Sequence, residues 1–253
     1  MILVVSDMHL GYEGCNHEDF ISFLKGYRGR DVESLVLLGD IFDFWRRNNA
    51  RIVEENEEVM GRIQDLDAEK VHYVAGNHDY YILTLNKTSA DRPEDSFIVS
   101  KFLRLKDGDE CFFFVHGYQL ESILWEFPAS LEMYEKFSNE MCYNQDITGT
   151  FLSRIWDFKG YFSKKQRFIK DMDKSPQVRE NITEIYKFAV SNAKYLFLGM
   201  QPHEKLVFGH THRPFISKDK NVANTGSWVN ELEEKYQNSY VEIDDGEMDL
   251  KFF

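Results

Sequence analysis

The sequence lacks the features of several special protein classes. Cysteine is scarce, because only Cys15, Cys111 and Cys142 occur in 253 residues and no two of them form a CxxC pair. An odd, scattered set argues against a disulfide framework or a thiolate zinc site. No apolar run reaches the ~18 residues that a transmembrane helix requires. The first five residues are too short and too poor in basic residues for a signal peptide, so we expect a cytoplasmic protein with no transmembrane segment.

Basic residues are also in the minority, with 30 Lys and Arg against 43 Asp and Glu and a net charge of −13. This balance disfavours binding of nucleic acid through neutralisation of its phosphates. No strip of basic and aromatic residues is present that would bind a single strand. We therefore expect no nucleic-acid partner, whereas bound divalent cations would create a local positive site.

The first third of the chain predicts alternating strands and helices. Hydrophobic content of 43% and charged content of 29% are ordinary for a globular protein. Apolar runs predict strands at Ile2–Ser6, Ser34–Leu38 and Val71–Ala75, and helical spacing predicts helices at Glu18–Tyr27 and Arg51–Leu66. This β-α-β-α-β order is typical of a parallel sheet covered by helices.

The rest of the chain predicts a change of architecture. Phe97–Leu105 and Glu110–Val115 are expected to be antiparallel strands, with a turn at Asp107-Gly108-Asp109. Strands at Pro214–Ser217, Val222–Asn224, Ser239–Ile243 and Met248–Phe252 are expected to form a second, mixed sheet. No internal repeat or low-complexity linker is present, and we interpret residues 1–253 as a single domain.

Residues 118–201 are rich in aromatic side chains and in helical spacing, and we interpret them as a helical insertion within that domain. Its aromatic residues would form its own core and its seam with the main body. Alternatively, the insertion is a cap that shapes a substrate pocket. Four basic residues would then line the pocket, or would simply face solvent: Lys164, Lys165, Arg167 and Lys170.

Five apolar strands run into residues that can bind metal ions. The segments are Asp7-Met8-His9, Gly39-Asp40-Ile41-Phe42-Asp43, Gly76-Asn77-His78-Asp79, His116-Gly117 and Gly209-His210-Thr211-His212. Ligands of open α/β sheets bind at the carboxyl ends of the strands, so we expect these segments to converge. Asp7 and His9 are two residues apart, as are His210 and His212, and in extended chain this spacing puts both side chains on one side.

The donors in these segments are imidazoles, carboxylates and one amide oxygen, without a thiolate. Such a set suits manganese, iron, cobalt, nickel or zinc better than calcium. There are too many donors for one ion, and a carboxylate that bridges two ions is the economical arrangement. Each segment alone is a weak signal, but the five together are specific. The histidines outside this pattern, which are His17, His72 and His203, are expected at the surface or in packing roles.

The set DMH, GDIFD, GNHD, HG and GHTH resembles the motifs of the calcineurin-like metallophosphoesterases. The resemblance covers the chain outside the insertion and implies a four-layered α/β/β/α sandwich with a binuclear metal site. It implies one metal held by Asp7, His9, Asp40 and His212, and a second held by Asp40, Asn77, His116 and His210. Asp40 would bridge two divalent ions, with manganese expected first and iron, zinc, cobalt and nickel as alternatives. Asp43 would lie behind the ligands and orient a histidine.

The resemblance also implies hydrolysis of a phosphomonoester, phosphodiester or pyrophosphate bond in a phosphorylated small molecule. A hydroxide bridging two ions ~3.5–4 Å apart would attack the phosphorus. His78 would stabilise the developing charge or protonate the leaving oxygen, and Asp79 would orient that imidazole and raise its pKa. Arg46 and Arg47 would either grip a second phosphate or carboxylate or lie in a solvated loop.

Three alternatives remain open at this point. The GHTHRP stretch, the chain length and the insertion are similar to the UDP-2,3-diacylglucosamine hydrolase branch, which suggests a pyrophosphatase of that type. That branch carries arginine where this chain has His78, so we do not extend its lipid-nucleotide substrate to this chain. The others are a non-catalytic binding module on the same fold, disfavoured because all ligands are kept, and a repair-type nuclease, disfavoured by the acidic charge.

Overall fold

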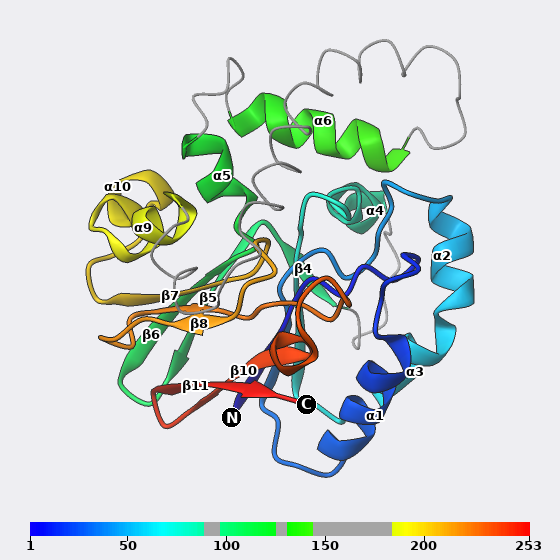
Figure 1. Cartoon of the computed structure of the whole chain (residues 1–253), viewed down its shortest axis with the longest axis horizontal. Helices are drawn as coiled ribbons and strands as arrows, with labels where there is room; N and C mark the ends of the chain where they lie inside the picture. The colour runs from blue at the N-terminus through cyan, green and yellow to red at the C-terminus, as the bar shows by residue number, and fades with distance from the viewer. Residues whose placement is uncertain (89–96, 125–130, 144–183) are drawn as a thin grey trace.

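The computed structural model describes residues 1–88, 97–124, 131–143 and 184–253 (Figure 1). The first sheet has the strand order β11-β10-β1-β2-β3-β4. Its strands are β1 (Ile2–Val5), β2 (Ser34–Leu37), β3 (Lys70–Val74), β4 (Ile98–Ser100), β10 (Ser239–Asp244) and β11 (Glu247–Phe252). β1, β2, β3 and β4 are parallel to one another, whereas β10 and β11 are antiparallel to their neighbours.

The second sheet is also mixed and has the strand order β5-β6-β7-β9-β8. Its strands are β5 (Phe102–Asp107), β6 (Glu110–Val115), β7 (Glu204–Phe208), β8 (Phe215–Ile216) and β9 (Val222–Asn224). β6, β7 and β9 run parallel, and β5 and β8 flank them in antiparallel pairings. The two sheets therefore each present the carboxyl ends of several parallel strands.

Three hydrophobic clusters show that the fold has four layers. One cluster lies between the first sheet and the helices α1 (His17–Tyr27), α2 (Asn49–Glu55) and α3 (Glu57–Gln64). A second joins alternate residues of both sheets, such as Val4, Val36, Phe112 and Val207. The third lies between the second sheet and the helices α5 (Tyr118–Leu124), α9 (Glu184–Val190) and α10 (Ala193–Leu198). The predicted α/β/β/α sandwich is confirmed.

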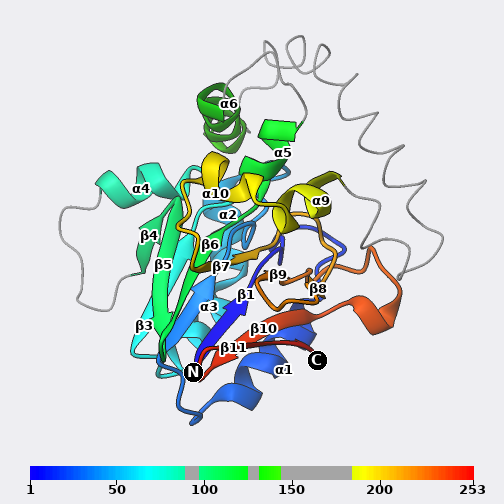
Figure 2. The same cartoon turned by 90° about the vertical axis from the view of Figure 1, so that its left-hand side faces the viewer.

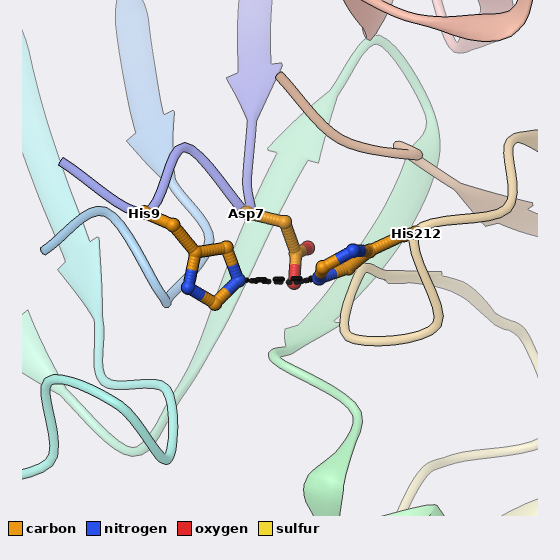
Figure 3. A group of neighbouring side chains, drawn as sticks. All are labelled: Asp7, His9 and His212. Atoms are coloured by element: carbon orange, nitrogen blue, oxygen red, sulfur yellow. Dashed lines mark hydrogen bonds and ion pairs between the residues drawn. The ribbon is translucent and has the colours of Figure 1, made fainter. Parts of the chain in front are cut away.

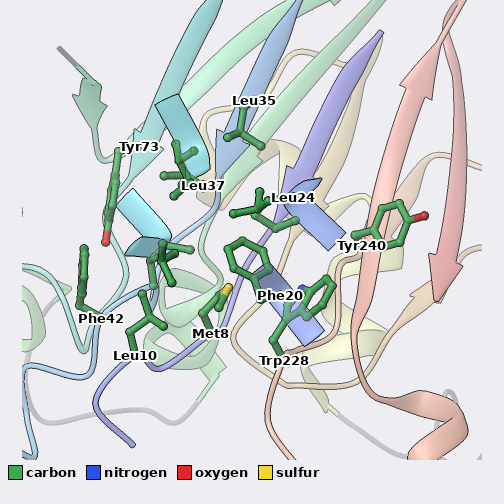
Figure 4. Packing of buried hydrophobic residues seen from close by; sticks show 14 of the residues in the cluster. Met8, Leu10, Phe20, Leu24, Leu35, Leu37, Phe42, Tyr73, Trp228 and Tyr240 are labelled. Atoms are coloured by element: carbon green, nitrogen blue, oxygen red, sulfur yellow. The ribbon is translucent and has the colours of Figure 1, made fainter. Parts of the chain in front are cut away.

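Helix α1 illustrates how the sequence forms the outer layer. Its apolar residues recur at helical spacing, and Phe20, Phe23 and Leu24 are buried against the sheet. Trp228, fully buried, packs against Phe20 and Phe23 with ring centroids 4.9 Å from each (Figure 4). The backbone N–H of Trp228 donates to the carbonyl of Asp7, two residues after the end of β1, over 3.1 Å. This packing fixes the end of β1 where the first motif begins.

Two strand assignments from the sequence are wrong. Phe97–Leu105 is not one strand: the chain leaves the first sheet after β4 and enters the second as β5. Ser239–Ile243 and Met248–Phe252 belong to the first sheet, where β10 pairs with β1, and not to the second. Alternation of apolar residues shows which faces of a strand are buried, and both faces of β10 are buried, so the pattern does not say which sheet it joins.

The described part of residues 118–201 is mainly helical. It contains α5, α6 (Leu131–Tyr143), α9 and α10, and Figure 2 shows α5 and α6 beyond the end of the sheets at which β1 ends. The basic residues Lys164, Lys165, Arg167 and Lys170 lie outside the described residues. The remaining elements are α4 (Ile82–Thr88) and a 3-10 turn at Glu234–Tyr236. Among the described residues, no helix has the length and apolar character needed to cross a membrane.

Candidate metal centre

The five motif segments converge at the carboxyl ends of the strands in both sheets. Asp7, Asp40 and Asn77 follow β1, β2 and β3, His116 directly follows β6, and His210 and His212 follow β7. The loops are tied to one another, because the N–H of Asp7 donates to the carbonyl of Gly39 and the N–H of His9 donates to that of Asp40. The polar side chains are thus held next to one another by backbone hydrogen bonds between motifs.

The backbone at this convergence is strained. Nine non-glycine residues among those described have positive φ, and five of them are candidate metal ligands: Asp7, His9, Asp40, His210 and His212. The left-handed region costs an L-residue ~1–2 kcal/mol. Such strain clusters where a local geometry serves function. The expectation that each Asp-x-His or His-x-His pair lies in extended chain is therefore wrong, because both members of each pair have a left-handed backbone conformation.

Asp7, His9 and His212 form the first cluster (Figure 3). His212 Nε2 lies 3.3 Å from Asp7 Oδ1, and His9 Nε2 lies 3.1 Å from His212 Nε2. Two imidazole nitrogens and a carboxylate oxygen therefore face a common point from two loops, the one after β1 and the one after β7. His210 does not join this cluster, so the two histidines of the last motif serve different groups.

Asp40, His116 and His210 form the second cluster. His116 Nε2 lies 3.1 Å from Asp40 Oδ2, and His116 Nδ1 donates to the carbonyl of Leu38 over 2.8 Å. The same Oδ2 lies 3.8 Å from Nε2 of His9 in the first cluster. The other oxygen, Oδ1, accepts the backbone N–H of His78 over 2.8 Å. One oxygen of Asp40 therefore faces both clusters, as a bridging carboxylate would.

Several buried atoms at this site have no hydrogen-bond partner. They are Asp7 Oδ1 and His116 Nε2, whose closest ion-pair contacts are with His212 and Asp40, and Asn77 Oδ1, and each of the three residues is at most 2% exposed. A buried polar atom left unpaired costs about 1–3 kcal/mol. All three atoms are of types that coordinate transition-metal ions: a carboxylate oxygen, an amide oxygen and an imidazole nitrogen. The residues present therefore fit a pair of divalent cations.

Two glycines make this close approach possible. A Cβ on Gly76 would overlap the side chain and backbone N of Asp40, and a Cβ on Gly209 would overlap Ser6 and Asp7. Neither glycine needs a positive φ, so the requirement is for space. The glycines of the third and fifth motifs allow neighbouring loops to pack against the carboxylates.

The structure corrects the expected partner of His78. Its Nδ1 lies 2.9 Å from Oδ1 of Asp43, not against Asp79. Asp43 Oδ2 also lies 3.4 Å from Nδ1 of His9. Burial alone would raise the pKa of Asp43, but the charges and hydrogen bonds of His78 and His9 outweigh it and hold that pKa below its ordinary value. The Asp43 carboxylate therefore contacts two histidines at once.

Asp79 instead braces the loops. Its Oδ2 accepts the N–H of Ile41 over 2.8 Å and the hydroxyl of Tyr73 over 2.6 Å, and its Oδ1 accepts the N–H of Gly76 over 2.7 Å. Burial and the nearby charge of Asp40 raise the pKa of Asp79. Its four-residue motif gave no sign of the contacts to Ile41 and Tyr73, because Ile41 lies on the loop after β2 and Tyr73 lies in β3. Asp79 therefore does not orient the imidazole of His78, contrary to the expectation from the sequence.

The two arginines after the second motif lie in different surroundings. Arg46 Nε donates to Asp43 Oδ2 over 2.6 Å, and its guanidinium lies 4.1 Å from the ring centroid of Tyr12. Arg47 pairs with both carboxylate oxygens of Glu55 in α2, at 2.8 and 2.7 Å. Arg46 is therefore at the edge of the site, whereas Arg47 is held on an outer helix.

Two carboxylates that the sequence did not suggest contact the last motif. Glu121 Oε2 in α5 lies 2.7 Å from His210 Nε2, and Glu231 Oε2 lies 3.0 Å from His212 Nδ1. The hydrogen bond to His212 lowers the pKa of Glu231 to about 2. Both glutamates lie in segments with no recognisable motif, so no sequence signal identifies them. Only the folded structure identifies these two glutamates, because folding places them next to His210 and His212.

A family model described as calcineurin-like phosphoesterase matches residues 1–216. The chain belongs to this family. The match includes all five motifs and ends four residues after His212. It agrees with the α/β sandwich and with the clusters of aspartate and histidine. A comparison with curated proteins found no match.

Solved structures provide weaker likenesses to this calcineurin-like phosphoesterase. A dimetal phosphatase from Danio rerio is 14% identical, with 99% of this chain and 94% of that chain covered and a TM-score of 0.49. An archaeal phosphodiesterase is 14% identical, with 100% and 99% covered and a TM-score of 0.42. Vps29 from Entamoeba histolytica is 15% identical, with 99% and 96% covered and a TM-score of 0.40. At these levels none of the three says what this chain does.

Replacing Gly76 by alanine tests the packing around Asp40. Gly76→Ala should weaken the binding of Mn²⁺ by about 10–100-fold, because the added methyl group displaces the carboxylate. Calorimetric titration with Mn²⁺ measures the effect. Gly61→Ala in α3 is the matched control, since nothing lies within 4 Å of a Cβ there. Equal affinity in the two variants would contradict the packing described for Asp40.

Metal binding should release protons. Burial lowers the pKa of His116, but Asp40 and Asp7 raise it to about 9, and Asp7 and Glu231 likewise raise the pKa of His212 against burial to about 10. Both imidazoles are then protonated at pH 7 in the metal-free protein, whereas a metal needs them neutral. Titration with Mn²⁺ in two buffers of different ionisation enthalpy should report release of about two protons. The affinity should rise as the pH rises toward 9, and an affinity independent of pH would exclude these histidines as ligands.

Proposed function

We propose that this calcineurin-like phosphoesterase is a binuclear metal-dependent hydrolase of phosphate esters or anhydrides. The observation that carries the proposal is the position of Asp40, whose Oδ2 lies 3.1 Å from His116 and 3.8 Å from His9. The two ligand clusters meet at this atom, and the buried nitrogen and oxygen donors around it fit cations. The ligands proposed for the pair are Asp7, His9, Asp40, Asn77, His116, His210 and His212.

The donor set also bears on the identity of the ions. The proposed ligands are imidazole nitrogens and carboxylate and amide oxygens, which suit manganese, iron, cobalt, nickel and zinc. We propose manganese as the first of these to test. When bound, two such ions activate water and stabilise charge on a phosphoryl group. Protonation of the leaving oxygen and binding of the rest of the substrate are left to protein side chains.

His78 is the side chain proposed to touch the leaving oxygen. Asp43 accepts from its Nδ1, and Trp45 stacks on its ring with centroids 4.2 Å apart. The ring is thus fixed from the edge and from one face, so Nε2 is the nitrogen that remains to donate a proton. The backbone N–H of the same residue is bonded to Asp40, which ties its position to that of the ligands.

The substrate class proposed is a phosphorylated small molecule. Arg46 lies beside Asp43 with a half-exposed side chain and can contact a second phosphate or a carboxylate. Arg47 is a poorer candidate for binding substrate because its guanidinium forms a salt bridge with Glu55. A UDP-2,3-diacylglucosamine-type pyrophosphatase is a finer alternative, and His78 in place of the arginine of that branch speaks against it. The helical insertion is proposed to shape the pocket that makes the choice.

A non-catalytic binding module is the alternative from another class. The complete ligand set, the orphaned buried donors and a braced His78 favour catalysis, because a binding surface needs none of them. An assay for hydrolysis of a simple phosphate ester distinguishes the two functions. A nuclease of the repair type is disfavoured by the net charge of −13.

The metal-loaded protein should hydrolyse bis-p-nitrophenyl phosphate in the presence of Mn²⁺ and lose this activity in excess chelator. His78→Ala should retain both ions and lose about 10²–10⁴-fold in kcat, since it removes the general acid. Release of p-nitrophenol measures the rate, and elemental analysis measures the metal content. His203→Ala is the matched control, because this histidine is exposed and lies just before β7, at the end of the strand opposite to the fifth motif.

Two results would contradict the proposal in different ways. A wild-type protein that binds two Mn²⁺ ions but hydrolyses no mono-, di- or pyrophosphate ester would favour the binding module. Unchanged turnover in His78→Ala would leave the hydrolase in place and remove the role of this histidine.

A further inference from the structure

The first helix of the insertion reaches into the metal centre. Helix α5 begins at Tyr118, directly after the His116-Gly117 motif, and Glu121 lies in its first turn. The N–H of Gly117 donates to the side chain of Gln119 over 3.0 Å, and the N–H of Glu121 donates to the carbonyl of Gly117. The motif and the helix are therefore continuous, and the position of Glu121 is set by the same turn that ends the strand carrying His116.

The side chain of Glu121 is buried beside a candidate ligand. The residue is 5% exposed, and its Oε2 lies 2.7 Å from Nε2 of His210, which is 7% exposed. A carboxylate is costly to bury unless a hydrogen bond or a charge compensates it. The mechanism proposed above gives Glu121 no task, although it contacts a residue of the second cluster.

The contact determines which nitrogen of His210 meets an ion. An imidazole has two nitrogens, and the one that donates to a carboxylate cannot also bind a metal. With Nε2 engaged by Glu121, Nδ1 is the nitrogen that would be left to bind an ion. A carboxylate behind a ligating imidazole fixes its tautomer and ring orientation and makes it a stronger donor. His212 has the same arrangement with the other nitrogen, since its Nδ1 faces Glu231.

We propose that Glu121 is a positioning residue for the ion held by Asp40, His116 and His210, and that the insertion is thereby a working part of the metal centre. This inference rests on the proposed binuclear site. It predicts a selective effect, because Glu121 contacts His210, a candidate ligand of the second cluster. Removing the Glu121 side chain should weaken the binding of one ion and leave the binding of the other unchanged.

The test is calorimetric titration of the full chain with Mn²⁺. The wild type should bind two equivalents. Glu121→Ala should bind one equivalent with wild-type affinity and the other about 10–100-fold more weakly. Glu121→Gln, whose amide oxygen can still accept from Nε2, should lie between the two. Glu132→Ala is the matched control, because it removes an equal charge from an exposed position in α6.

Thermal unfolding of the metal-free variants separates positioning from general destabilisation. If Glu121→Ala does not fold, Glu121→Gln carries the test, with weakening of one site as the supporting result. Wild-type affinity at both sites in Glu121→Ala, or equal weakening of both, would overturn the inference. Neither result would affect the proposed function, whereas a wild type that binds no ion would remove the proposed function itself.

Discussion

The structure depends on the compensation of charge around Asp40. This carboxylate is 2% exposed, and Asp7 and Asp43 beside it are fully buried. Three buried carboxylates close to one another require positive partners, because an unpaired buried charge is far more costly than an unpaired surface charge. In the metal-free chain the compensation comes from protonated histidines, which is why the pKa of His116 is raised to about 9 despite its burial. Cations bound at the proposed site would replace those protons.

This constraint explains features that would otherwise be unrelated. Five candidate ligands adopt the left-handed backbone region, which only a surrounding framework can enforce. That framework consists of the hydrogen bonds between loops and of Asp79, which joins Ile41, Tyr73 and Gly76. Gly76 and Gly209 contribute by having no side chain where the carboxylates pass. The sandwich of two sheets supplies the strand ends from which all these loops depart.

Most of the fold and the ligand candidates could be predicted because they leave local signals. An apolar run followed by Gly39-Asp40 marks a buried strand and its end without any knowledge of the rest. Asp43 was expected to orient a histidine, but which histidine it contacts, and the contact of Glu121 with His210, could not be predicted, since these partners are 35 and 89 residues apart. The placement of β10 in the first sheet failed for a similar reason, because pairing is decided by the whole fold and not by the strand. Distant contacts are set by topology.

The most direct test of the account is anomalous diffraction from crystals grown with Mn²⁺, measured at the manganese absorption edge. The account predicts two peaks ~3.5–4 Å apart, one on each side of Asp40 Oδ2. The first should lie among Asp7, His9 and His212, and the second among Asn77, His116 and His210. A single peak, or peaks away from Asp40, would contradict the bridging role from which the rest of the account follows.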